Sequence, residues 1–226
     1  MHKKYFFAPH IIFSFLIISI FSGCEKTFVP DPVPAQLSFT EDFDTVANLY
    51  KKGWVFVNNS KPQGNVTWDQ GIAGVFAAYS YHASGDEYIL ADFLFGDNLS
   101  TLSGWMITPP IEMKNGDIFS FYTRTVSNNP YPDRLQVRVN LSDSSAEVGN
   151  TATSVGKFTT LLKDINSNLA TGGFPQDWTK YEFTLSGLAA PLKRRIAFRY
   201  YVDNGGPSGF NSYAVGIDRF QFESVQ

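Results

Sequence analysis

The sequence has a single cysteine, Cys24, and only three histidines among its 226 residues. One cysteine cannot form a disulfide within the chain, so folding has to rest on burial of apolar surface. Zinc sites are built mainly from cysteine and histidine, and acyl-transfer triads need a histidine beside a nucleophile. His2 and His10 precede or border an apolar N-terminal run, which leaves His82, expected to be a solvated loop residue. The shortage argues against zinc chemistry and against a serine or cysteine hydrolase.

Positive charge is also in short supply. Lysine and arginine number 18 against 21 aspartates and glutamates, which gives a net charge of −3. Removal of an N-terminal segment that holds Lys3 and Lys4 but no acid would leave 16 basic residues and a net charge of −5. Binding of nucleic acid needs a basic footprint on the protein surface. The composition therefore predicts that nucleic acid is not a partner.

The apolar run at residues 11–21 (IIFSFLIISIF) is too short to cross a membrane, which takes about 20 residues. It follows a basic start and precedes Ser22, Gly23 and Cys24, which is the arrangement of a secretory signal. The junction resembles the lipobox of bacterial lipoproteins, with Phe21 where leucine is usual. The resemblance implies a lipoprotein signal peptide over residues 1–23 and acylation of Cys24. An ordinary signal peptide that ends near a buried cysteine is the alternative.

The rest of the chain divides into two parts. Residues 24–36 have prolines at positions 30, 32 and 34 and no hydrophobic periodicity, so we expect an extended, semi-rigid tether. Residues 37–226 are predicted to form one domain, since no internal repeat is found. A lipidated Cys24 would attach this domain to the outer membrane or the cell surface.

Strand patterns dominate the domain. Alternating apolar residues mark 134–141, 181–185 and 196–202, and residues 117–126 are apolar at both parities, as in a central strand. Residues 105–113 are interrupted by two prolines. The segments are separated by turn residues such as KNGD, NNPYPD and DNGGPSG, and only TTLLKDINSNL (159–169) hints at a helical turn. The predicted fold is all-β, a two-sheet antiparallel β-sandwich of the jelly-roll type. The residues expected to face inward are Leu135, Val137, Val139, Leu141, Tyr181, Phe183, Leu185, Ile196, Phe198, Tyr200, Val202, and, on one face of 105–113, Trp105, Ile107, Ile111 and Met113.

Several stretches of the domain resemble one known family. They are FTEDFD, GWMITPPIEM, DRLQVRV, WTKYEFTLSGL, RRIAFRYYV and GIDRF, spread from residue 37 to residue 222. Together they are similar to the choice-of-anchor J domain, a group related to cleaved-adhesin domains and to MAM-type jelly rolls. The resemblance implies a non-catalytic module of a secreted protein. It also implies a structural calcium ion between the first and last strands.

Two register anomalies point to a cation independently. In YAVGIDRFQFE the apolar parity changes between Ile217 and Phe220, so the strand must kink or bulge at Asp218. In LSFTEDFD, Glu41 falls on the inward, apolar face. If the first and last strands are neighbours, the two carboxylates would repel unless a cation joins them, and calcium prefers such oxygen ligands. The predicted ligands are Glu41 and Asp218, with Asp42, Asp44 and Asp133 as weaker ones. The alternative is an ion pair with Arg219, Arg195 or Arg124.

Aromatic residues make up 16 % of the chain, and some of them fall in loops. Rings flanked by Asn, Asp and Gly suit sugars, because a ring stacks on the apolar sugar face and polar neighbours bond the hydroxyls. Loop packing is the competing explanation for each ring. The predicted ligand-binding residues are Tyr131, Phe174, Phe210 and Tyr213, and Tyr79 and Tyr81 are further loop rings.

These patterns favour a cell-envelope lipoprotein that binds a glycan or a protein partner and has no catalytic activity. A carboxylate-dependent glycoside hydrolase is the rival in another class, since two suitably spaced acids suffice for that reaction. A purely structural or assembly subunit without a small ligand is the third possibility. Sequence alone does not decide among them.

Overall fold

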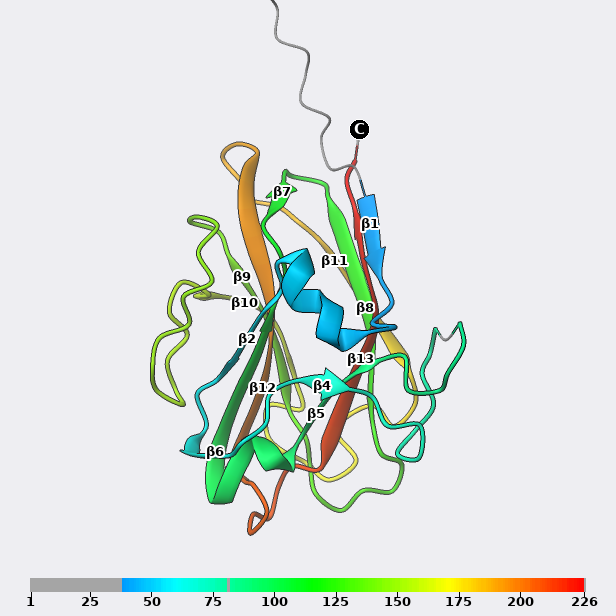
Figure 1. Ribbon diagram of the computed structural model, residues 1–226. Coiled ribbons are helices and arrows are strands. Elements are labelled where there is room, and N and C mark those ends of the chain that lie inside the picture. Colours follow the sequence, from blue (N-terminus) through cyan, green and yellow to red (C-terminus); the bar gives the residue numbers. More distant parts are fainter. Residues whose placement is uncertain (1–37, 81, 226) are drawn as a thin grey trace, which may run out of the picture. The chain divides into compact units, whose positions relative to one another are not determined.

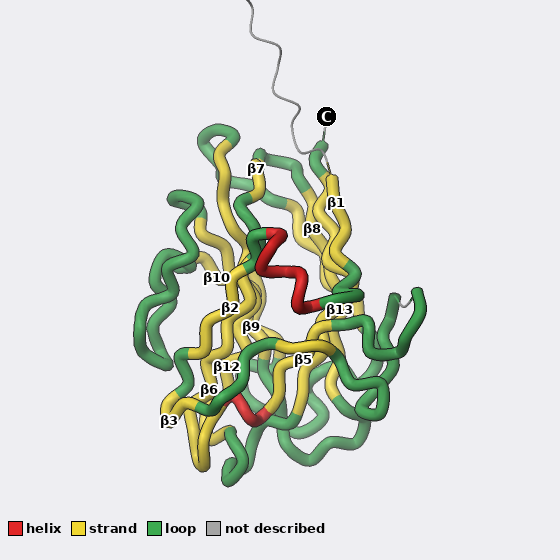
Figure 2. Tube along the Cα trace, in the orientation of Figure 1, coloured by secondary structure: helices red, strands yellow, loops and turns green. Residues whose placement is uncertain are grey.

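A computed structural model describes residues 38–80 and 82–225 of the chain. Two antiparallel sheets pack face to face (Figure 1, Figure 2), which confirms the predicted β-sandwich. The signal segment, Cys24, the tether, Leu37 and Tyr81 lie outside the described residues. The first sheet consists of β11 (Thr179–Thr184), β8 (Ile118–Thr125), β13 (Ala214–Glu223), β5 (Ile89–Asp92) and β4 (Asp69–Gln70), with β1 (Ser38–Glu41) paired to β13.

The second sheet has the order β10, β9, β12, β6, β2. Its strands are β10 (Thr160–Ile165), β9 (Leu135–Asn140), β12 (Leu192–Gly205), β6 (Gly96–Ile107) and β2 (Val55–Asn58), with β3 (Lys61–Gln63) paired to β6 and β7 (Ile111–Met113) paired to β12. Two short 3₁₀ helices, η1 (Val46–Lys52) and η2 (Phe93–Phe95), complete the described elements. Neither of these helices is long and apolar enough to cross a membrane.

The core between the sheets follows the predicted alternation. On β12, the residues Ile196, Phe198, Tyr200 and Val202 are all fully buried. β9 contributes its odd-numbered positions in the same way, and β8 is an internal strand between β11 and β13. Phe198 and its ring partners, among them Phe121, bring aromatic surface from the two sheets into contact. Burial of this apolar surface is the main source of stability in a chain whose one cysteine cannot form an internal disulfide.

The prediction that 105–113 presents one apolar face is wrong. Trp105 and Ile107 are buried on the outer side of the second sheet, where Phe158 and Val148 from the 141–158 segment cover them. Ile111 and Met113 instead face the core between the sheets. The reason is that Pro109 and Pro110 end β6, so β7 restarts with a new register. A strand buried on both faces gives no parity signal from which this could be read.

The helical reading of residues 159–169 is also wrong. Residues 160–165 form β10, which pairs with β9 and has a register shift between Leu161 and Lys163. The shift leaves Leu161 exposed and turns Ile165 into the core. The bulge breaks the alternation, and the apolar spacing left behind imitates that of a helix.

The last strand has the kink that its sequence predicts. β13 pairs with β8 in one register up to Asp218 and in another from Gln221 onward. Arg219 occupies the gap with φ of +49°, a left-handed conformation that a non-glycine residue seldom adopts. β1 pairs with the second half of β13, with Glu41 opposite Phe220. The first and last strands are therefore neighbours, as the sequence suggested.

Candidate functional site

Asp218 lies inside the bulge of β13 and has no exposed surface. Its carboxylate accepts three backbone N–H groups: Tyr79 N at 2.8 Å, Ser80 N at 2.9 Å and Arg219 N at 2.6 Å. Two of these donors belong to the loop before β5. The kink thus aims the acid at that loop and ties the loop to the last strand.

Burial raises the pKa of the Asp218 carboxyl to about 7, and repulsion from Asp42 adds to the rise. The backbone N–H groups of Ser80, Arg219 and Tyr79 oppose this but do not cancel it. A buried acid with a raised pKa is one whose negative charge is not fully compensated by its surroundings. A further positive charge beside Asp218 would therefore be favourable.

The negative charge of Asp42 is also incompletely compensated. Its Oδ1 atom is buried and accepts no hydrogen bond from any described residue. The nearest cationic atom is Arg219 Nη1, at 3.7 Å, and that nitrogen donates a hydrogen bond to Ser80 Oγ at 2.8 Å. Arg219 is thus a loose ion-pair partner of Asp42, whereas its hydrogen bond to Asp218 comes from its backbone N–H.

Glu41 is buried as predicted, with an exposed fraction of 7 %, but its partner is one that the sequence did not indicate. Lys52 Nζ lies 2.8 Å from Glu41 Oε2, and Phe43 N donates to Oε1 at 3.2 Å. η1 brings Lys52 over the end of β1. Arg195 donates to backbone carbonyls and Arg124 to a carbonyl and a hydroxyl, so neither has a hydrogen bond to these acids.

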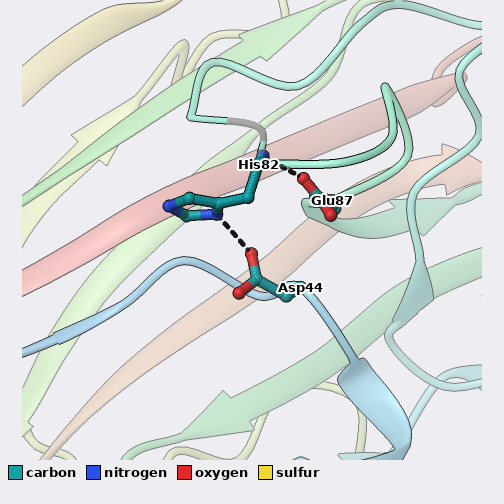
Figure 3. A group of neighbouring side chains, drawn as sticks. All are labelled: Asp44, His82 and Glu87. Carbon is teal, nitrogen blue, oxygen red and sulfur yellow. Dashed lines mark hydrogen bonds and ion pairs between the residues drawn. The ribbon is translucent and has the colours of Figure 1, made fainter.

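Asp44, His82 and Glu87 form a group beside this bulge (Figure 3), with one ligand atom from each within 4.8 Å of the others. His82 Nδ1 and Asp44 Oδ1 are 3.0 Å apart, and the hydrogen bond between them raises the pKa of the imidazole. Glu87 accepts N–H groups from His82 and Ala83, which lowers the pKa of its carboxyl. His82 is exposed, as expected of a loop histidine, and such a trio could hold a metal ion.

Asp218 and Asp42 repel each other at the β13 bulge, and this pair of acids is here called the bulge cluster. Asp133 is not among them. Its buried carboxylate accepts hydrogen bonds from Thr125 Oγ1 at 2.6 Å, Tyr200 OH at 2.5 Å and Tyr213 N at 2.8 Å, next to the first residue of β13. This acid organises loops at the other end of the strand, and the prediction that places it beside Asp218 is not supported. The bulge cluster consists of Asp42 and Asp218, and Asp44, His82 and Glu87 form a separate group.

A second feature lies where β13 begins. A cavity of about 210 Å³ opens there between three loops, and it is here called the ring cavity. Tyr131 and Tyr213, both predicted as ligand-binding, line it with exposed fractions of 44 % and 37 %. Phe210, in the same loop as Tyr213, is 76 % exposed. The full lining is Phe93, Tyr131, Gly206, Pro207, Gly209, Ser212 and Tyr213.

The loops around the ring cavity hold each other in place. Phe93 N donates to the Tyr213 carbonyl at 3.1 Å, and the two rings lie 6.2 Å apart. Ser212 N donates to the Pro132 carbonyl at 2.9 Å, which joins the loop before β13 to the loop before β9. Asn129 fixes Tyr131 by accepting its N–H and donating to its carbonyl. A site ordered in advance loses less entropy when a ligand binds.

Phe174 does not belong to this site, and the expectation of an exposed ring is wrong. Only 3 % of it is exposed, and it packs in the main core. The neighbouring glycines and proline mark a loop, but a loop can still insert a ring into the core. Tyr79 is partly exposed, yet its ring stacks on Tyr122 with 3.7 Å between centroids, so packing explains it.

Sequence reasoning missed three contributors. Phe93 and Pro207 line the ring cavity, and Lys52 neutralises Glu41. Phe93 follows directly on a strand and is typical of a core residue, whereas the Gly-Gly-Pro sequence at 205–207 indicates only a turn. No local pattern links Lys52 to Glu41, because the pairing depends on how η1 is placed.

No family model and no curated protein matches the sequence. Among solved structures, the K1 cleaved-adhesin domain of Lys-gingipain from Porphyromonas gingivalis W83 aligns over 84 % of this chain and 99 % of its own, with a TM-score of 0.57 and 17 % identity. The K3 domain of the same protein aligns over 84 % and 98 %, with a TM-score of 0.54 and 15 % identity. A xylan-binding domain from Paenibacillus barcinonensis covers 83 % of this chain and 95 % of its own, at a TM-score of 0.41 and 13 % identity. At these identities the similarity establishes the fold, and the chain has the jelly-roll β-sandwich of the cleaved-adhesin domains.

Proposed function

We propose that the chain is a non-catalytic binding module that takes a glycan in the ring cavity. The observation that carries the proposal is the convergence of Phe93 from η2 and of Tyr131 and Tyr213 from two loops on one uncharged hollow. Two of these rings keep more than a third of their surface exposed, so a ligand in the cavity can reach them.

The lining suits a sugar in its chemistry. Tyrosine rings present an apolar face for the C–H face of a sugar and a hydroxyl for its polar edge. Among the described residues, neither Tyr131 nor Tyr213 has a hydrogen-bonded phenolic hydroxyl, so both groups are free for a ligand. A flat protein partner would need an interface of at least about 1,000 Å², to which so small a hollow would contribute little.

Tyr213→Ala and Tyr131→Ala are expected to weaken glycan binding by at least tenfold. Each substitution removes a ring whose stacking and buried area together contribute roughly 1.5 kcal/mol or more to the binding free energy. Their melting temperatures should stay near that of the wild type, since both rings are partly exposed. A glycan array followed by calorimetry with the strongest hit measures the effect. Tyr50→Ala is the matched control, because Tyr50 is 60 % exposed on η1 and lines no part of the cavity.

Two results would contradict the proposal: an array without hits, or equal affinity in wild type and both variants. Phe210→Ala adds a graded test. Its ring is the most exposed in this region but lines no cavity wall, so a smaller loss of affinity is expected than for Tyr213→Ala.

We also propose a structural calcium ion in the bulge cluster. Support comes from the buried Asp42 Oδ1, which accepts no hydrogen bond from the described residues and has only a loose ion pair with Arg219, and from the raised pKa of Asp218. Both indicate negative charge that is not fully compensated. Carboxylate oxygens are the ligands calcium prefers, and the ion would draw Asp218 and Asp42 together. Asp44 follows Asp42 by two residues and belongs to the second candidate metal group with His82 and Glu87. Glu41 is the weaker ligand here, because Lys52 already neutralises it.

The hydrolase alternative has less support. Asp218 is fully buried and Glu41 nearly so, so neither carboxylate can reach a glycosidic bond. The ring cavity contains no acid in its lining. Incubation with the glycan that the array identifies is expected to release no reducing sugar, and release of sugar would favour the hydrolase.

We further propose that acylation of Cys24 anchors this module to the cell envelope. Cys24→Ser is expected to move the protein from the membrane fraction to the soluble fraction and to abolish labelling with a radioactive fatty acid. Both effects follow because one sulfur and the new N-terminus carry the acyl chains. Ser22→Ala, two positions away, is the control that should leave both readouts unchanged. A Cys24→Ser protein that stays membrane-bound, with no label on the wild type, would refute the lipid anchor.

A further inference from the structure

A second hollow lies beside the ring cavity, and it has a different character. Its volume is about 340 Å³. Its lining has no aromatic ring and includes the polar side chains of Gln63, Asn65 and Asp97. It is here called the amide cavity, and its full lining is Gln63, Gly64, Asn65, Val66, Leu94, Gly96, Asp97 and Pro207.

The sequence builds the amide cavity through a close backbone approach. A Cβ atom on Gly64 would lie 2.0 Å from the Leu94 carbonyl oxygen, so only glycine lets the segment after β3 pass so near η2. Asn58 then holds that segment with its amide, which donates to the carbonyls of Val66 and Phe95, each at 2.9 Å. Like the ring cavity, the hollow is formed by segments fixed to one another.

The two cavities share a wall. Pro207 lines both of them, and the consecutive residues Phe93 and Leu94 of η2 line one each. Pro207 is held close to β6, since a Cβ on Gly206 would lie 2.2 Å from the Asn98 carbonyl oxygen and Ser208 N donates to that same oxygen. The ring cavity alone is smaller than the roughly 300 Å³ at which ligand pockets commonly begin, and the amide cavity brings the pair within that range.

The chemistry of the pair is complementary. Among the described residues, the side chains of Gln63, Asn65 and Asp97 make no hydrogen bond, so two amides and one carboxylate are free to bond hydroxyl groups. Neither lining contains lysine or arginine, and Asp97 would repel an anion. A ligand that extends from the rings to the amides should therefore be rich in hydroxyls and uncharged.

From this geometry we infer that the two cavities are subsites of one extended site for a neutral oligosaccharide, with one sugar on the rings and the following sugars against Gln63 and Asn65. This inference rests on the proposed glycan-binding function and adds ligand length and charge to it. It assigns Gln63 and Asn65 as binding residues, which no sequence pattern had indicated.

The test uses an array of neutral, uronate-bearing and sulfated oligosaccharides of one to six units, followed by calorimetry on the length series of the strongest hit. Neutral chains are expected to bind best, with affinity rising from two units onward. The double variant Gln63→Ala/Asn65→Ala should lower the affinity for the longest chain by about tenfold, because two hydrogen bonds are lost. Its affinity for the shortest oligosaccharide that binds should equal that of the wild type. Tyr213→Ala should weaken every length.

Asn150→Ala is the matched control, because Asn150 is an exposed amide that lines neither cavity. Thermal melts of all variants verify that the fold is intact. Equal affinity along the length series, an unchanged double variant, or preference for anionic chains would each overturn the inference and leave the proposed function standing. An array with no hit at all would remove the proposed function itself, so the two failures can be told apart.

Discussion

Arg199→Ala is expected to lower the free energy of unfolding by about 3–5 kcal/mol, a large effect for a change outside the core between the sheets. Only 2 % of Arg199 is exposed, although it lies on the outer face of β12. Its guanidinium stacks 3.9 Å from the ring centroid of Tyr201 and 4.8 Å from that of Trp105. The 141–158 segment covers this layer and excludes water from it.

The expected loss has two sources. The guanidinium donates to Ser103 Oγ at 3.0 Å, to Gln136 Oε1 at 3.3 Å and to the Ala152 carbonyl, and alanine would remove all three buried hydrogen bonds. Ser103 Oγ and Gln136 Oε1 would keep one donor each, Trp105 Nε1 and Arg138 Nε, so the Ala152 carbonyl would lose most. Truncation would also open a cavity between two rings. Burial lowers the pKa of Arg199 to about 10, and no carboxylate of the described residues forms an ion pair with it. The stabilisation thus comes from packing, ring contacts and neutral acceptors.

Denaturant unfolding of three variants measures these contributions. Arg199→Met keeps the volume of the stem and should lose less than Arg199→Ala, because only the hydrogen bonds and the ring contacts of the charge are removed. Lys193→Ala, exposed on the same strand, should change stability by no more than about 0.5 kcal/mol. A loss below 1 kcal/mol for Arg199→Ala would show that this layer does not hold the 141–158 segment in place.

Most strands of the sandwich could be predicted because apolar and polar residues alternate along the strand, with the apolar residues on the face toward the core. Leu135, Val137 and Val139 alternate with polar residues, and the same rule exposed the slip at Asp218. The rule fails where both faces are buried. Trp105 and Arg199 lie under the 141–158 segment, whose own sequence gives no sign that it covers a sheet.

The sites were predicted less completely, for a related reason. Tyr131 and Tyr213 could be named because aromatic residues in turns are conspicuous. Phe174 has the same local signal and is buried, since exposure is set by tertiary packing and not by the turn. Lys52 and Gln63 have no local signal, because an ion pair and a shared cavity wall depend on where distant segments meet.

Chelation of calcium is expected to lower the melting temperature by roughly 5–10 °C, and added calcium should restore it. An ion that binds only the folded state stabilises it by ~2.7 kcal/mol at a hundredfold excess over the dissociation constant. For a domain of this size, each kcal/mol shifts the melting temperature by about 2–4 °C. Asp218→Asn and Asp42→Asn should each remove most of this response, because they take away the two acids whose charge is uncompensated. Glu41→Gln, whose acid Lys52 already neutralises, should retain it.

The pH dependence gives an independent measurement of the same site. Without an ion, Asp218 has a pKa of about 7 in the folded state against 3.8 as its ordinary value. Its proton therefore stabilises the fold most below about pH 4, and that stabilisation is lost as the pH rises through about 7. Calcium needs the ionised carboxylate, so its effect on the melting temperature should be large at pH 8 and small at pH 5.

The variant Arg219→Ala distinguishes a bound calcium ion from an internal counter-ion, the guanidinium of Arg219. It lies 3.7 Å from Asp42 Oδ1 with a side chain that is 42 % exposed, so it can move aside for an ion. If calcium neutralises the bulge cluster, Arg219→Ala should leave the calcium response intact or increase it, because a competing cation is gone. If the arginine itself serves as the cation, the melt should be indifferent to chelator at pH 8 and Arg219→Ala should be strongly destabilising. In that case the bulge would still position Asp218 to hold Tyr79 and Ser80, and the guanidinium would take the place assigned here to the metal.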